Sequence, residues 1–125
     1  MARKTHKTRA MEKLQSLGWE VGDVERVVRT GGKAVSFDLF GCLDLVAIKG
    51  KRTLGLQVTD HTHVSHRVAK MEEEIRLWKC LEAGWLIEVW GVRNHEARDG
   101  SFAVVRSFEL EKDGAVTVYG DSSVL

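Results

Sequence analysis

The sequence predicts a single α/β domain, spanning residues 1–125, in which helices pack against a mixed β-sheet. Three observations predict this class. Apolar residues recur at helical spacing from Val64 to Trp78, and short apolar runs of strand type occur at residues 43–48 and 85–92. Twelve glycines and no proline divide these segments. With 43% hydrophobic and 30% charged residues, the chain has the composition of a soluble globular domain.

The N-terminal segment is predicted to be a basic arm, residues 1–10, that leads into a short helix. Met11, Leu14 and Leu17 recur at helical spacing, and Gly18 is expected to end the helix. The arm and the start of the helix carry five cations against the single acid Glu12. Two interpretations stay open: a solvated, frayed terminus, or an arm that contacts phosphate groups.

Strands are expected next. Residues 19–28 read as one strand with an irregularity near Gly22, and a turn at Gly31 and Gly32 leads to a second extended stretch at residues 34–39. The apolar run at residues 43–48 and the segment 53–59 are expected to pair as a hairpin, with Gly50 in its loop.

One long helix follows in the prediction. Val64, Val68, Met71, Ile75 and Trp78 form its apolar stripe, and Gly84 is expected to end it. An apolar strand at residues 85–92 and a hairpin formed by residues 102–110 and 116–119 complete the chain. The predicted order is therefore a helix, three strands, a helix, a strand and a C-terminal hairpin.

Composition narrows the functional classes. The net charge of +1 gives no bulk attraction for a polyanion, so that any such binding must come from local patches. Cys42 and Cys80 lie in apolar runs and are expected to be reduced core residues, and no secretory or bilayer-length apolar segment occurs. A cytoplasmic protein is therefore expected. Glycine-rich phosphate loops, dinucleotide motifs and nucleophile elbows are absent from the sequence.

Two polar residues interrupt apolar strands. Asp44 lies between Leu43 and Leu45, and Gln57 lies between Leu56 and Val58, although polar residues in such positions need partners. A hairpin loop of two or four residues would place Asp44 directly opposite Gln57, with Cβ atoms about 5 Å apart. A three-residue loop would put them on opposite faces. The facing pair could share one Mg²⁺ or Mn²⁺, or could hydrogen-bond to each other.

These residues resemble the motifs of the PD-(D/E)XK nuclease superfamily, and in particular small phage-type and archaeal Holliday-junction-resolvase-like members. The resemblance runs from Glu25 to Gly91 and rests on residues 38–44, on residues 57–59, and on Arg67 and Lys70. It implies a restriction-endonuclease-like core, a metal bound by Asp44 and Gln57, and hydrolysis of DNA, branched or processed DNA included. It also implies a homodimer.

The sequence departs from this family at Thr59, where the family carries its catalytic lysine. Lys70 and Arg67 lie three residues apart on one face of the predicted helix, and we expect one of them to supply the missing charge. If neither reaches the site, the chain would be a degenerate nuclease-fold module that binds nucleic acid or a protein partner. A structural protein with an unrelated mixed sheet is the third alternative.

Further candidates surround this pair. Asp38 is either a third metal ligand or the cap of the turn at Gly41, and Glu12 either holds a metal-bound water or is solvated. Glu25 is expected to be a charge on the strand surface. His61, His63 and His66 are expected to be exposed, with a metal site or a general base as alternatives. The residues predicted to contact nucleic acid are Arg3, Lys4, Lys7, Arg9, Lys49, Lys51 and Arg52.

Overall fold

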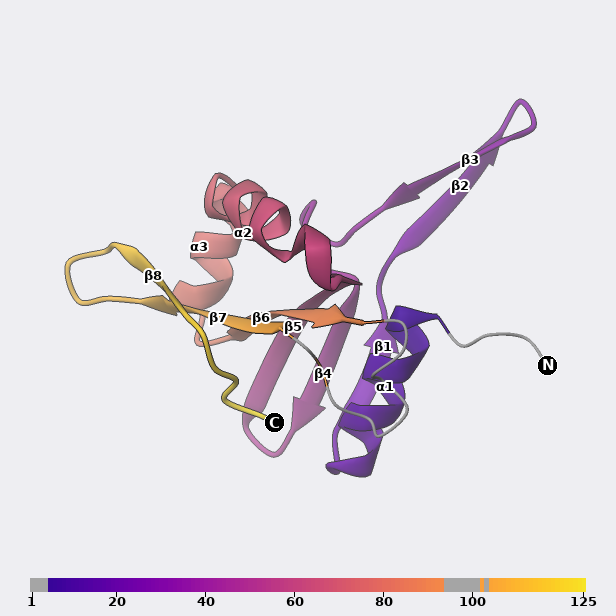
Figure 1. Cartoon of the computed structure of the whole chain (residues 1–125). Helices are drawn as coiled ribbons and strands as arrows, with labels where there is room; N and C mark the ends of the chain where they lie inside the picture. Colours follow the sequence, from indigo (N-terminus) through magenta and orange to yellow (C-terminus); the bar gives the residue numbers. More distant parts are fainter. Residues whose placement is uncertain (1–4, 94–101, 103) are drawn as a thin grey trace.

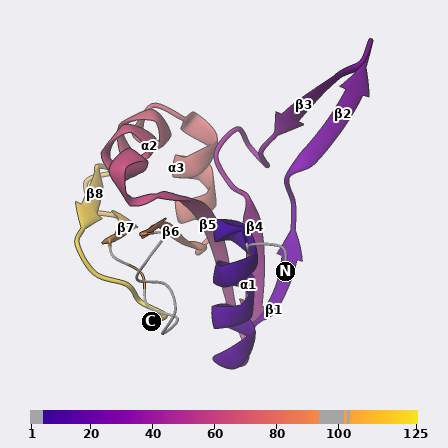
Figure 2. The ribbon, with the colours of Figure 1, turned by 45° about the vertical axis from the view of Figure 1, so that its right-hand side comes forward.

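A six-stranded mixed sheet with helices on both faces forms the body of the molecule, and a two-stranded hairpin projects from it (Figures 1 and 2). The computed structural model describes residues 5–93, 102 and 104–125. The strand order of the large sheet is β1-β4-β5-β6-β7-β8, and β2 pairs with β3 alone. The predicted mixed α/β class is therefore confirmed.

Helix α1, His6–Ser16, covers one face of the sheet. Thr5 is its N-cap, because the Thr5 hydroxyl accepts a hydrogen bond from the Thr8 N–H at 3.0 Å. Ala10 and Leu14 are completely buried against the strands. Since the helix begins at His6, residues 6–10 of the predicted basic arm are helical.

The central strands are β1, Glu20–Asp23, β4, Leu45–Lys49, and β5, Arg52–Asp60, which pair antiparallel. The β4–β5 ladder runs from Leu45↔Leu56 to Lys49↔Arg52, so that Gly50 and Lys51 form a two-residue turn. Gly50 has a φ of 59°, a backbone conformation that glycine adopts without steric strain. The register predicted for the two-residue loop is confirmed.

The prediction of one strand over residues 19–28 is wrong. β1 ends at Asp23, and β2, Arg26–Thr30, pairs instead with β3, Lys33–Phe37, in a separate hairpin. The break occurs because the Asp23 carboxylate accepts a hydrogen bond from the Glu25 N–H at 3.1 Å, which turns the chain out of the sheet.

The prediction of one long helix is also wrong. After a 3₁₀ turn at His61–His63, the segment forms two helices: α2, Val64–Glu72, and α3, Ile75–Glu82. Glu74 adopts an extended conformation and caps α3 by accepting from the Arg76 N–H. This break changes the phase of the apolar stripe, so that Ile75 is 67% exposed while Leu77 is buried.

The remaining strands are β6, Leu86–Val92, β7, Val104–Leu110, and β8, Val116–Tyr119. β6 runs parallel to β5, and β7 and β8 continue the sheet antiparallel. Of the strand predicted at residues 102–110, residue 103 lies outside the described residues.

Two hydrophobic cores lie on opposite faces of the sheet. Trp19 and Trp90 are buried on the face covered by α1, and Phe108 on the face covered by α2 and α3. Trp78, in the predicted apolar stripe, and Trp85, at the start of the predicted strand 85–92, are only half-buried. None of the helices in the described residues is long and apolar enough to span a membrane.

Candidate metal centre

Asp44 lies immediately before β4, the second strand of the sheet, and hydrogen bonds to neighbouring backbones fix its position. Its N–H donates to the Leu56 carbonyl at 2.9 Å, and its carbonyl accepts from the Val24 N–H at 3.0 Å. The Val58 N–H also donates to the Asp44 carboxylate at 2.9 Å. Only 7% of the residue is exposed, so the carboxylate is held rigidly at the wall of a cavity.

Gln57 faces Asp44 across the β4–β5 hairpin, as the two-residue loop predicts. The Gln57 amide nitrogen donates to the Asp44 carboxylate at 3.0 Å. This contact is the mutual hydrogen bond that the sequence left open. It also orients the amide, because its oxygen is then the atom that can serve as a ligand for a cation.

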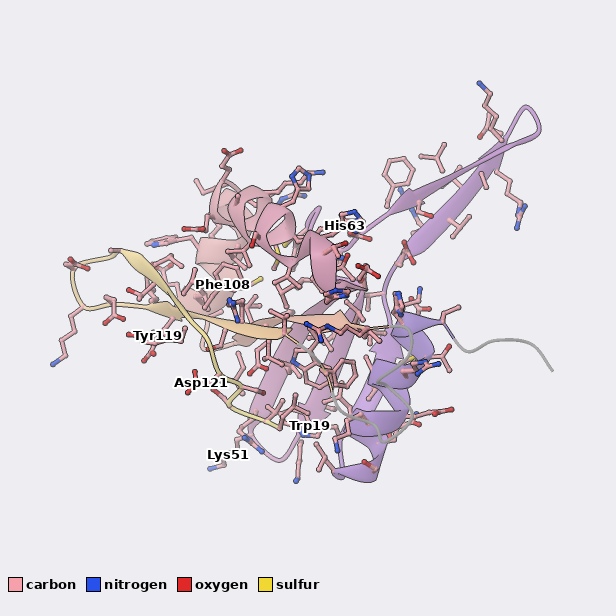
Figure 3. The ribbon with its side chains drawn as sticks, in the orientation of Figure 1. Trp19, Lys51, His63, Phe108, Tyr119 and Asp121 are labelled. Atoms are coloured by element: carbon pink, nitrogen blue, oxygen red, sulfur yellow. The ribbon has the colours of Figure 1, made fainter. Side chains whose placement is uncertain are left out.

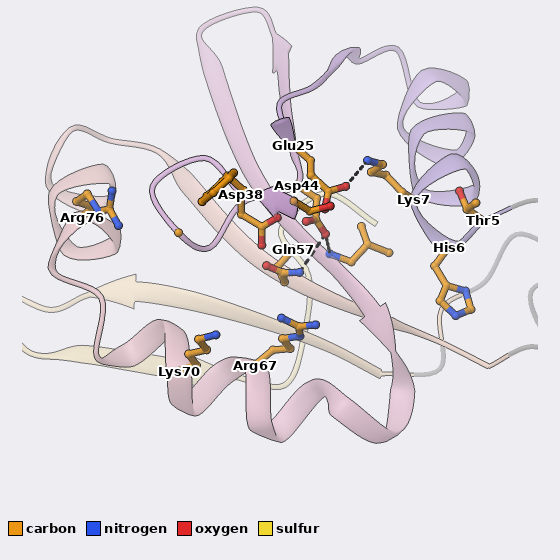
Figure 4. Close-up of a pocket in the computed structure, with 14 residues that line it drawn as sticks. Thr5, His6, Lys7, Glu25, Asp38, Asp44, Gln57, Arg67, Lys70 and Arg76 are labelled. Carbon is orange, nitrogen blue, oxygen red and sulfur yellow. Dashed lines mark hydrogen bonds and ion pairs between the residues drawn. The ribbon is translucent and has the colours of Figure 1, made fainter. Parts of the chain in front are cut away.

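Three carboxylates converge at this point. One ligand atom from each of Glu25, Asp38 and Asp44 lies within 4.8 Å of the other two. Among the described residues, these three form the one group of at least three Asp, Glu, His or Cys side chains that are close enough to share a metal ion. Figure 4 shows the three acids together above Gln57. Glu25, expected to be a charge on the strand surface, lies between β1 and β2 and is one of these three acids.

The chain brings these acids together by two local turns. The Asp23 turn directs Glu25 toward Asp44, because the adjacent Val24 is hydrogen-bonded to the Asp44 carbonyl. Asp38 ends the hairpin formed by β2 and β3, and its carbonyl accepts from the Gly41 N–H, so the predicted turn at Gly41 is also present.

The backbone conformation at position 41 favours glycine over any residue with a side chain. Its φ is 72°, and a Cβ atom there would lie 2.9 Å from the Arg76 guanidinium and 3.0 Å from the Glu74 carboxylate. Phe40, just before it, also has a positive φ, of 55°. The two residues make a tight reversal that returns the chain from Asp38 to Asp44.

The pKa of Asp44 is raised from 3.8 to about 7, chiefly because the carboxyl is buried. The negative charges of Asp38 and Glu25 act in the same direction, as does hydrogen bonding to the Asp38 carboxyl. The Val58 N–H acts in the opposite direction, since it stabilises the ionised form. The raised pKa therefore reflects mainly the burial of Asp44, to which the neighbouring acids add.

An open cavity of about 870 Å³ extends from these acids. Its opposite wall carries Arg67 and Lys70 of α2, which point toward the acids from across the cavity (Figure 4). The Arg67 Nε atom is buried and has no hydrogen-bond partner among the described residues. The predicted site residues Asp44, Gln57, Asp38, Arg67 and Lys70 thus line one cavity.

Lys7 and His6 line the same cavity, from the first turn of α1. The Lys7 ammonium lies 2.7 Å from the Glu25 carboxylate and 2.9 Å from that of Asp23. Burial acts to lower the pKa of Lys7, but hydrogen bonds to Glu25 and Asp23 outweigh it and raise the pKa. Lys7, predicted to contact nucleic acid, therefore anchors α1 to the acidic group.

Among the residues that the structure describes, the others predicted to bind nucleic acid do not line the cavity. Lys51 lies at the tip of the β4–β5 hairpin (Figure 3), at the end of the strands opposite to Asp44 and Gln57. Lys49 donates to the Leu17 carbonyl at 2.7 Å, and Arg52 stacks 4.8 Å from the centre of the Trp19 ring. Arg9 is half-buried on α1, while Arg3 and Lys4 lie outside the described residues.

The remaining candidates are also separate from the acids. Glu12 is exposed on α1 and is not part of the cavity wall. His63 and His66 are exposed as predicted, whereas His61 is half-buried, with Nδ1 3.5 Å from the Asp60 carboxylate. The histidines do not form a three-ligand group among the described residues.

The cysteines are free and buried, as expected. Burial raises the pKa of the Cys42 thiol to about 12, so that it is protonated at neutral pH and is not a nucleophile.

Sequence comparisons leave the chain without an assigned family. No family model matches it, and a search of curated proteins finds no match either. The functional interpretation therefore depends on the geometry of the cavity.

Proposed function

We propose that this protein is a divalent-metal-dependent endonuclease that hydrolyses phosphodiester bonds in DNA. The observation that carries the proposal is the convergence of Glu25, Asp38 and Asp44 within 4.8 Å, beside an open cavity whose far wall holds Arg67 and Lys70. Acids that attract a metal, set against cations that attract phosphate, form the combination that phosphodiester hydrolysis requires.

The donors present suit Mg²⁺ or Mn²⁺. Three carboxylates and the Gln57 amide oxygen are all hard oxygen ligands, which these ions prefer over nitrogen or sulfur. Bound there, the ion would polarise the phosphodiester and activate a water molecule for attack. Burial chiefly raises the pKa of Asp44, and the negative charges of Asp38 and Glu25 raise it further, so that a cation bound there would offset their repulsion.

The remaining tasks belong to side chains of the protein. Arg67 and Lys70 face the acids and would bind the non-bridging phosphate oxygens, where negative charge develops during the reaction. Thr59 is buried on β5 at the position of the family lysine and carries no charge, so these two residues take over its electrostatic role. Val58 and Gln57 hold the Asp44 carboxylate in place.

The arrangement of elements also supports the proposal. Helix α1, strands β1, β4 and β5, the α2–α3 segment and the parallel strand β6 occur in the order expected for a restriction-endonuclease-like core. In this interpretation the β2–β3 hairpin is an insertion between the first two core strands, and β7 and β8 extend the sheet.

The test is cleavage of single-stranded, duplex and branched DNA in Mg²⁺ or Mn²⁺. We expect the wild type to cut at least one substrate, EDTA to abolish the activity, and Asp44→Asn to lower it at least about a hundredfold. Lys70→Ala should reduce cleavage without preventing metal binding. Asp121→Asn and Lys79→Ala are matched controls outside the cavity, and both should cleave normally.

A catalytically degenerate module that binds nucleic acid is the second candidate, and Thr59 in place of a lysine favours it. This alternative predicts DNA binding without cleavage in either metal. If the wild type leaves every substrate intact while it still binds DNA, the degenerate module becomes the better account.

A further inference from the structure

The hairpin formed by β2 and β3, residues 26–37, projects away from the body of the molecule (Figures 1 and 2). We call it the β-arm. All residues of both strands are exposed, and no strand of the large sheet pairs with it. A two-stranded hairpin is only marginally stable alone in water, so exposed apolar residues in such an element need a binding partner.

Charge indicates the kind of partner. The β-arm carries Arg26, Arg29 and Lys33 and has no acidic residue, although the whole chain has a net charge of only +1. This local excess of positive charge favours a polyanion over a second copy of a nearly neutral chain.

The two faces of the β-arm differ. Directly paired residues share a face, so one face carries Arg26 with Phe37, Val28 with Val35, and Thr30 with Lys33. Phe37 and Val35 are each 48% exposed, and the Arg26 guanidinium lies 5.6 Å from the centre of the Phe37 ring. Exposed apolar side chains are thus bordered by cations at both ends of the arm, a pattern that suits base edges bordered by phosphates.

The base of the β-arm lies at the acidic cavity. Glu25 directly precedes β2 and Asp38 directly follows β3, and Ser36 and Phe37 line the cavity itself. Two of the three converging carboxylates therefore flank the arm. A ligand that lies along the arm would also pass over the proposed metal centre.

From these observations we propose that the β-arm enters the major groove of duplex DNA and positions it over the acidic cavity. The inference rests on the proposed function, since it names the form of nucleic acid that this site takes. Each strand has five residues and extends about 17 Å at roughly 3.4 Å per residue. The B-DNA major groove, about 12 Å wide and about 8.5 Å deep, admits a two-stranded ribbon.

Groove shape also selects between duplexes. The major groove of A-form RNA is deep and too narrow for protein side chains to read, so the β-arm fits B-form DNA and not double-stranded RNA. At the tip, Gly31 and Gly32 have positive φ angles of 58° and 77° and no side chains, and a Cβ atom on either residue would meet no other atom within 4 Å. No neighbouring group therefore fills the space beside these two residues.

The test compares two charge-reversal variants of equal net charge. Arg29→Glu with Lys33→Glu changes the distal half of the β-arm, away from the cavity, while Lys79→Glu with Lys112→Glu changes exposed cations elsewhere. Fluorescence anisotropy in EDTA measures the affinity for a duplex of about 20 base pairs across a salt series. We expect the arm variant to lose at least about tenfold in affinity and its salt slope to fall by about 2.

The control variant should bind within about twofold of the wild type, and double-stranded RNA should compete poorly. Equal losses in both variants, or an unchanged affinity of the arm variant, would overturn the inference. So would a wild-type dimer that the arm variant converts to a monomer with unchanged DNA affinity, since a second copy would then be the partner.

Calorimetric titration with Mn²⁺ separates this inference from the proposed function. The arm variant should bind Mn²⁺ as the wild type does, while Asp44→Asn should lose the metal and retain metal-free DNA binding. Metal binding with no arm-dependent DNA affinity would overturn the β-arm inference alone. Arm-dependent DNA affinity with no metal binding would overturn the proposed catalytic function alone.

Discussion

Replacement of Asp44 by asparagine should stabilise the metal-free protein, although it should abolish metal binding. The Asp44 carboxylate is buried beside Asp38 and Glu25, and its pKa is raised from 3.8 to about 7. The folded state therefore disfavours the ionised form. Asparagine has nearly the same shape, accepts the Val58 hydrogen bond, and carries no charge.

The magnitude follows from proton linkage. A raised carboxyl pKa means that stability is unaffected below the unfolded value of 3.8 and falls as pH rises toward the folded value of about 7. At roughly 1.4 kcal/mol per pKa unit, the full penalty is about 4 kcal/mol above neutral pH. Because water in the open cavity screens part of this interaction, we expect a gain of roughly 2 kcal/mol for Asp44→Asn at about pH 8.

The assay is urea unfolding of the wild type and Asp44→Asn in EDTA, at several pH values between about 5 and 8. The stability difference between the two proteins should grow as pH rises, and Asp121→Asn, an exposed control, should show no such trend. Mg²⁺ should then stabilise the wild type but not the variant, because only the wild type binds the ion. The reasoning is refuted if Asp44→Asn is less stable at about pH 8, or if the difference does not change with pH.

Three further substitutions test the fold. The buried Glu88 carboxylate accepts hydrogen bonds from the Trp90 indole, the Ser122 hydroxyl and the Ser123 N–H, so Glu88→Ala should lower the free energy of unfolding in urea by about 2–4 kcal/mol. The exposed control Glu109→Ala should be near neutral, and equal effects of both changes would contradict this prediction. Glu74→Ala should lower the free energy of unfolding by about 0.5–2 kcal/mol, more than Glu73→Ala, since Glu74 caps α3; a larger effect at Glu73 would refute the cap. Gly91→Ala should lower the free energy of unfolding by about 1–3 kcal/mol in thermal denaturation, because the new Cβ atom would lie 2.5 Å from Val64 and 2.9 Å from the His61 backbone. Gly120→Ala should be tolerated, and a neutral Gly91→Ala would contradict the prediction.

The pairing of Asp44 with Gln57 could be predicted because it depends on local signals. Gly50 identifies a short hairpin loop, and a two-residue loop fixes the face on which each side chain lies. Polar residues in apolar strands then identify the site. The helical spacing of Arg67 and Lys70 likewise predicts that they share one face of α2, although only the structure shows that this face lines the cavity.

Glu25 and the break between α2 and α3 could not be predicted, since both depend on single side-chain hydrogen bonds. The Asp23 carboxylate turns the chain at Glu25, and Glu74 caps a new helix where the apolar spacing alone suggests continuity. The β-arm could not be predicted either, because its valines are typical of any β-strand. Only the described fold shows that no strand of the large sheet pairs with the arm and that these valines lie outside the core.

The most direct test of the central claim is a calorimetric titration of the protein with Mn²⁺, at about pH 7.5 and without DNA. The account predicts saturable binding to the wild type, a loss of at least about tenfold in affinity for each of Glu25→Gln, Asp38→Asn and Asp44→Asn, and unchanged affinity for Asp121→Asn. The absence of saturable binding at millimolar Mn²⁺, or equal affinity in all four variants, would contradict the claim that these three carboxylates form a metal centre.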